Sequence, residues 1–99
     1  KMNDLQIIEN MYDRKLLESN ETVVMAEGLE DALIGITATI PKRAIYDYWK
    51  CIGVLVNLED DDQSESTSFN YALEWLEDYV NATTKKEFVS HAPIFIKTI

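Results

Sequence analysis

The chain has 99 residues, nine of them basic and eighteen acidic, and therefore a formal net charge of -9. This length predicts a single domain over 1–99 and leaves no room for a two-domain enzyme. Nucleic-acid binding depends on clustered Lys and Arg, so the charge excludes direct DNA or RNA binding, and no apolar run is long enough to span a bilayer.

The use of cysteine and the first ten residues predict the compartment. Cys51 is the single cysteine, so an internal disulfide and a zinc site of several thiolates are both excluded. Asp4 and Glu9 interrupt the N-terminal segment KMNDLQIIEN, which therefore lacks the apolar centre of a secretory signal. We expect a cytoplasmic protein with no cofactor and no membrane attachment.

The first half of the chain predicts one helix and a small sheet. A helix is expected over 4–18, because apolar residues recur there with helical spacing. Strands are expected over 22–25, within 32–40 and over 44–46, with turns at Gly28 and at 41–43, forming a small antiparallel meander. The apolar residues of the predicted helix are Leu5, Ile8, Met11, Tyr12 and Leu16.

Residues 47–58 are compatible with either a buried strand or a helix. We favour the helix, because Asp47 is placed to cap it and the apolar residues fall on one side. Gly53 weakens either assignment. The apolar side of this predicted helix consists of Tyr48, Cys51, Ile52, Leu55 and Leu58.

A polar stretch over 59–68 precedes the clearest helix of the sequence, over 67–82, and a last strand follows over 94–96. The predicted fold class is therefore α+β, with about three helices packed on a small, mostly antiparallel sheet of three to four short strands. The helix over 67–82 has an apolar face formed by Phe69, Ala72, Leu73, Leu76 and Val80.

Four segments in order resemble a family of small uncharacterised proteins of tailed bacteriophages, including marine ones. They are EGLEDALIGI (27–36), AIYDYWKCI (44–52), ALEWLEDYV (72–80) and APIFI (92–96). The chain departs from the family pattern at EDDDQSESTS (59–68) and at NATTKKEFVSH (81–91). The resemblance implies a phage origin and the fold class, and it implies no activity or catalytic residue.

The acidic run is the first candidate recognition site. Asp60, Asp61 and Asp62, with Glu65 close behind, offer oxygen ligands that hard cations prefer. The carboxylates are contiguous and no glycine supplies the turn of a calcium loop, so a solvated loop is the favoured interpretation. The alternative function is an acidic inhibitor, or DNA mimic, that binds a basic host nucleic-acid-binding protein.

A hydrolase would need Cys51 as nucleophile, His91 as base and Asp47 to orient the base. No motif connects the three residues, and Cys51 lies on the apolar side of its predicted helix. A buried, inert cysteine is therefore favoured, and we expect no enzymatic activity.

The aromatic residues Tyr71, Trp75 and Tyr79 recur every four positions beside the apolar face of the helix over 67–82. Tyr and Trp are enriched in protein interfaces, where their large rings are buried and their polar tips stay hydrated. The leading hypothesis is a non-enzymatic interaction module that forms a homo-oligomer or binds a protein partner through these three residues.

Overall fold

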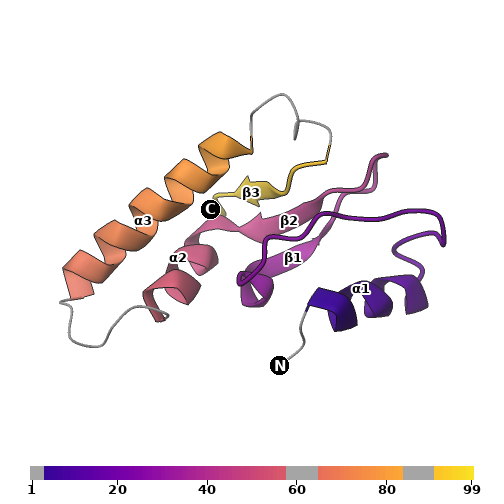
Figure 1. Ribbon diagram of the computed structural model, residues 1–99, viewed down its shortest axis with the longest axis horizontal. Coiled ribbons are helices and arrows are strands. Elements are labelled where there is room, and N and C mark those ends of the chain that lie inside the picture. The colour runs from indigo at the N-terminus through magenta and orange to yellow at the C-terminus, as the bar shows by residue number, and fades with distance from the viewer. Residues whose placement is uncertain (1–3, 58–64, 84–90) are drawn as a thin grey trace.

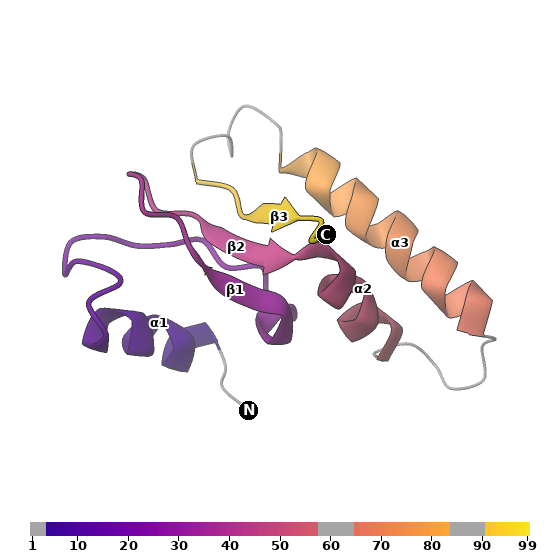
Figure 2. The same cartoon turned by 180° about the vertical axis from the view of Figure 1, so that it is seen from behind.

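The computed structural model describes residues 4–57, 65–83 and 91–99, which form three α-helices, one short 3-10 helix and three strands. The strands form one sheet in the order β1-β2-β3. In both views α1 lies on the β1 side of the molecule and α3 on the β3 side (Figures 1 and 2). The predicted α+β class with three helices is confirmed. The elements are α1 (Asp4–Asp13), η1 (Glu30–Ala32), β1 (Leu33–Ile36), β2 (Ala44–Asp47), α2 (Tyr48–Asn57), α3 (Glu65–Ala82) and β3 (Ile94–Ile96).

The sheet combines one antiparallel and one parallel pair. β1 and β2 form a hairpin whose register shifts between Leu33 and Gly35. β3 pairs with the other edge of β2 in parallel, with Phe95 opposite Tyr46. A parallel pair needs a long crossover connection, and here the chain passes through α2 and α3 between the two strands.

The predicted strand over Thr22–Met25 is wrong, because this segment is extended but joins no sheet. Its side chains alternate as in a strand, with Val23 buried and Val24 exposed. The Tyr46 hydroxyl holds the end of the segment: it donates to the Met25 sulfur and accepts the backbone N–H of Ala26, the next residue. The predicted three-stranded meander is therefore reduced to the β1–β2 hairpin.

The helix α1 ends at Asp13, five residues before its predicted end. Lys15 adopts a left-handed backbone with φ of 61°, while the Leu16 N–H donates to the Met11 carbonyl over 2.8 Å and the Lys15 N–H to the Tyr12 carbonyl over 3.0 Å. These two bonds define a Schellman motif, which satisfies the last carbonyls of a helix. Glycine usually holds the left-handed position, so the sequence carries no signal for this end.

The ambiguous segment before residue 58 is a helix, as favoured. Asp47 ends β2 and caps α2, because its Oδ1 accepts the backbone N–H of Lys50 at 3.2 Å. Tyr48, Cys51 and Ile52 are buried, as predicted for the apolar side. Leu58 lies outside the described residues.

One buried cluster connects α1, the segment that follows it, the sheet, α2 and α3. Ala72 and Leu76 of α3 are fully buried, as predicted, but Phe69 is 44% exposed. Phe69 precedes the buried Ala72 by nearly one turn, so the predicted apolar face is only partly covered. The largest fully buried side chains belong to Tyr46, Leu29, Leu76 and Cys51.

Candidate functional site

The aromatic stripe predicted on α3 divides into two parts. Tyr79 is partly buried, and its ring meets Phe95 of β3 edge-on, with centroids 5.8 Å apart. Trp75 stacks on Tyr79 at 5.4 Å with the ring planes 9° apart, yet remains 40% exposed. Tyr71 is 56% exposed. Tyr79 therefore belongs to the core packing, while Tyr71 and Trp75 face outward.

A cavity of about 260 Å³ opens beside the two exposed rings, and we call it the Tyr71–Trp75 pocket. Buried Leu29 and Ala72 form its apolar base, and Glu27 is exposed at its edge. Gly28 occupies the turn, as predicted, with φ of 91°, a backbone that other residues rarely adopt. The pocket is lined by Glu27, Gly28, Leu29, Leu55, Tyr71, Ala72 and Trp75.

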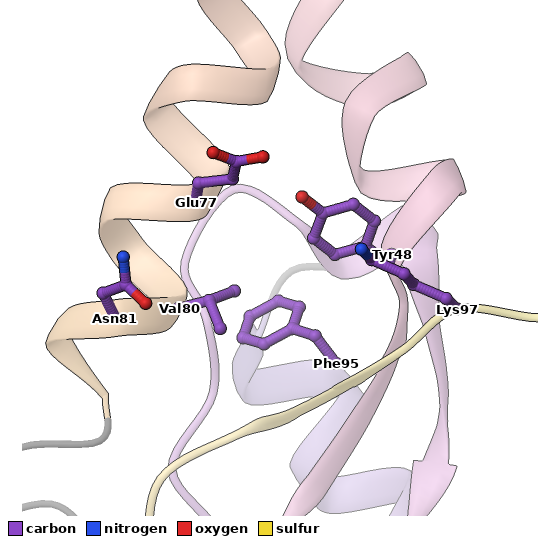
Figure 3. Close-up of a pocket in the computed structure, with 6 residues that line it drawn as sticks. All are labelled: Tyr48, Glu77, Val80, Asn81, Phe95 and Lys97. Carbon is purple, nitrogen blue, oxygen red and sulfur yellow. The ribbon is translucent and has the colours of Figure 1, made fainter.

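A second cavity, of about 400 Å³, lies between α3 and the start of α2. Figure 3 shows Phe95 and Val80 pointing into it, with the Lys97 nitrogen beside the Tyr48 ring. The Lys97 ammonium lies 4.9 Å from the Tyr48 ring centroid and 5.7 Å from that of Trp49. The Trp49 indole N–H donates to the Thr98 carbonyl at 3.3 Å. The cationic group of this cavity is therefore already engaged by the chain's own aromatic residues.

Glu77 at the edge of the second cavity affects the Tyr48 phenol. Burial raises the pKa of Tyr48, and the negative charge of Glu77 raises it further. The phenol therefore stays protonated near neutral pH, as a hydrogen-bond donor and not as a nucleophile.

The acidic candidates fall mostly outside the described residues. Asp60, Asp61 and Asp62 lie in the segment 58–64, and Glu65 is the first residue of α3. In the described part of the chain no cluster of His, Cys, Asp and Glu could hold a metal ion. Three further acidic residues, Glu74, Glu77 and Asp78, are exposed on α3.

The hydrolase arrangement receives no support from Cys51. The thiol is fully buried, as favoured, and burial together with the charge of Asp47 raises its pKa to about 12. Reactive cysteines have the opposite property, a lowered pKa and partial exposure. His91 is exposed and lines a different cavity, together with Glu18, Glu21 and Lys42.

The sequence did not predict that Leu29 and Leu55 line the Tyr71–Trp75 pocket. Leu29 precedes η1 in a stretch predicted as a turn, and Leu55 belongs to α2. Their approach to α3 is a long-range contact, for which the local pattern holds no signal. Tyr71 and Trp75 were found because their four-residue spacing is local.

Comparison with protein-family models, with curated proteins and with solved structures finds no match to this chain. The phage resemblance therefore stays a prediction. None of the described helices is long and apolar enough to cross a membrane.

Proposed function

We propose that the chain is a non-enzymatic protein-interaction module that binds a partner protein through the Tyr71–Trp75 face of α3. The observation that carries the proposal is the exposure of two large aromatic residues beside a cavity with an apolar base. Binding energy in protein interfaces is concentrated in a few Trp, Tyr and Arg residues that fill or border such pockets.

The packing of Trp75 against the core favours a preformed contact surface. Its ring is stacked on Tyr79, which in turn meets Phe95 of the sheet. An aromatic residue that is already ordered loses little conformational entropy when a partner covers it. Tyr71 contributes its exposed area one helical turn away.

Charge favours a different chain as the partner over a second copy. The net charge is -9, and Glu74 and Asp78 are exposed on α3 close to the two aromatic residues. A symmetric dimer through this face would bring these carboxylates toward their own copies, and like charges in an interface disfavour association. A basic partner would instead gain from the same carboxylates.

Site-specific photo-crosslinking tests the proposal. p-Benzoylphenylalanine replaces Tyr71 in one variant and the neighbouring exposed Asn70 in the control, which projects about 100° away around the helix. In an extract of the source organism we expect one discrete protein adduct from position 71, weakened by Trp75→Ala and absent from position 70. Equal adducts from both positions, or none, would contradict the proposed face.

Light scattering separates the two kinds of partner. We expect a monomer at high micromolar concentration. A dimer that Trp75→Ala dissociates would instead identify a second copy as the partner.

A further inference from the structure

We propose that the Tyr71–Trp75 pocket binds one cationic side chain, an arginine or a lysine, of the partner protein. The inference rests on the proposed function for its setting and goes beyond it by naming the chemistry that the pocket recognises. Three features of the described residues support it: the aromatic rings, the carboxylates around them, and another tyrosine and tryptophan of the chain that already hold a cation.

Tyr71 and Trp75 both expose ring surface to solvent, and Tyr79 covers one face of Trp75. Tyr71 and Trp75 lie one helical turn apart on α3 and are both substantially exposed. A guanidinium or ammonium group within about 6 Å of a ring centroid is attracted by the negative face of the ring, most strongly for Trp. Among the described residues no Lys or Arg lies over either ring.

The charges around the pocket have one sign. Glu27 lines it, and Glu74 and Asp78 are exposed on the neighbouring face of α3. Within the described ranges no basic residue lines the pocket. A wholly apolar side chain would cover this edge without compensating the Glu27 carboxylate. Arginine and lysine combine an apolar stem, which fits the base formed by Leu29 and Ala72, with a charged head for the edge.

Elsewhere in the chain a tyrosine and a tryptophan already hold a cation. Tyr48 and Trp49 form an edge-on aromatic pair with centroids 5.2 Å apart, and the Lys97 ammonium lies over both rings. This pair carries its own cation, whereas the exposed α3 residues do not. Because the chain has two tryptophans, Trp49 provides an internal control for Trp75.

The experiment is an NMR titration of the ¹⁵N-labelled chain that follows the indole N–H signals of Trp75 and Trp49. The probes are N-acetylarginine methylamide, its neutral isostere N-acetylcitrulline methylamide, and the apolar N-acetylnorleucine methylamide. We expect the arginine probe to shift the Trp75 signal saturably at millimolar concentration, with affinity at least about fivefold higher than that of either neutral probe. Added salt should weaken the binding of the arginine probe.

Matched variants locate the binding. Trp75→Leu should abolish the response of the backbone signals around the pocket, and Glu27→Gln should weaken it several-fold. Phe69→Leu is the control, because Phe69 is 44% exposed on the same helix but does not line the pocket. Each variant is first checked for a native ¹H–¹⁵N spectrum.

Three results would overturn the inference: equal affinity for the arginine and citrulline probes, an equal response at Trp49, or no saturable shift. The outcome is independent of the crosslinking test. If a partner is crosslinked at position 71 but the chain shows no preference for the arginine probe, the interaction face is supported and the cation pocket is rejected. If the chain binds the arginine probe but no partner is crosslinked, the cation pocket is supported and the interaction face is rejected.

Discussion

The backbone N–H of Ala26 donates a hydrogen bond of 2.7 Å to the hydroxyl of Tyr46, and both residues are buried. This bond ties the extended segment before η1 to the central strand of the sheet. The Tyr46 ring stacks on Phe95 at 5.4 Å, and Phe95 meets Tyr79, which stacks on Trp75. A continuous series of aromatic contacts therefore connects the centre of the core with the proposed binding face.

Replacing Tyr46 by Phe should lower the free energy of unfolding by about 1–3 kcal/mol, because the variant leaves the buried Ala26 N–H without its acceptor. Urea denaturation measures the loss. Tyr71→Phe is the matched control, since the Tyr71 residue is largely exposed, and it should change stability by less than about 0.5 kcal/mol. Equal effects of the two variants would show that the Tyr46 hydroxyl contributes little.

Leu29 should behave as a core residue although it precedes η1 in a turn. It is 1% exposed, so Leu29→Ala should cost about 2–5 kcal/mol through lost burial and the cavity left behind. Leu5→Ala, at a position of α1 that is 65% exposed, should change stability by about 0.5 kcal/mol or less. Thermal denaturation of both variants compares the two positions. A small loss for Leu29→Ala would mean that the surrounding residues collapse into the space.

The elements that were predicted correctly are those whose signal is local. The spacing along α3 and the cap at Asp47 each depend on a few neighbouring residues, and the structure contains both. The strand expected at Thr22–Met25 failed because pairing depends on a distant partner, and here the side chain of Tyr46 takes the Ala26 N–H in place of a neighbouring strand. Local β-propensity cannot distinguish these two outcomes.

The left-handed backbone of Lys15, just after the end of α1, can be tested by substitution. Lys15 holds a left-handed backbone that glycine adopts more readily. Lys15→Gly should therefore raise the free energy of unfolding by up to about 1 kcal/mol, the gain being reduced by the greater entropy of glycine in the unfolded chain. Lys15→Val should lower it, because β-branched residues are disfavoured at positive φ. Urea denaturation of the two variants decides the point, and equal stabilities would contradict the assigned motif.

The candidate site was only half predictable, for the same reason. Tyr71 and Trp75 are visible in the sequence as a helical repeat, but the division between the partly buried Tyr79 and its exposed neighbours depends on where β3 lies. Glu27 and Leu29 enter the pocket from a segment more than forty residues earlier in the chain. Their contribution became apparent only from the packing of the loop against α3.

The ionisation of the Cys51 thiol should lower the free energy of unfolding at alkaline pH. Burial and, to a lesser extent, the charge of Asp47 together raise the pKa of its thiol from 9.0 to about 12 in the folded chain. Between these values the unfolded thiol loses its proton while the folded thiol keeps it. The folded state then holds more protons, so the free energy of unfolding decreases with rising pH, by at most about 1.4 kcal/mol per pH unit. Below about pH 8 the thiol is protonated in both states and contributes no pH dependence.

Cys51→Ala isolates this effect from the two tyrosines that titrate in the same range. Burial raises the pKa of Tyr48 and of Tyr79 as well, and Glu77 adds to the shift of Tyr48. Both tyrosines therefore contribute to the dependence of the free energy of unfolding on pH. The variant keeps these contributions and lacks only that of the thiol. Urea denaturation in the presence of a reductant, at intervals from about pH 7 to pH 10, gives the stability difference between the two chains. We expect a constant difference up to about pH 8 and then a progressive loss of stability of the unmodified chain relative to Cys51→Ala. Parallel curves over the whole range would mean that the thiol ionises equally in both states, and would contradict its burial against Asp47.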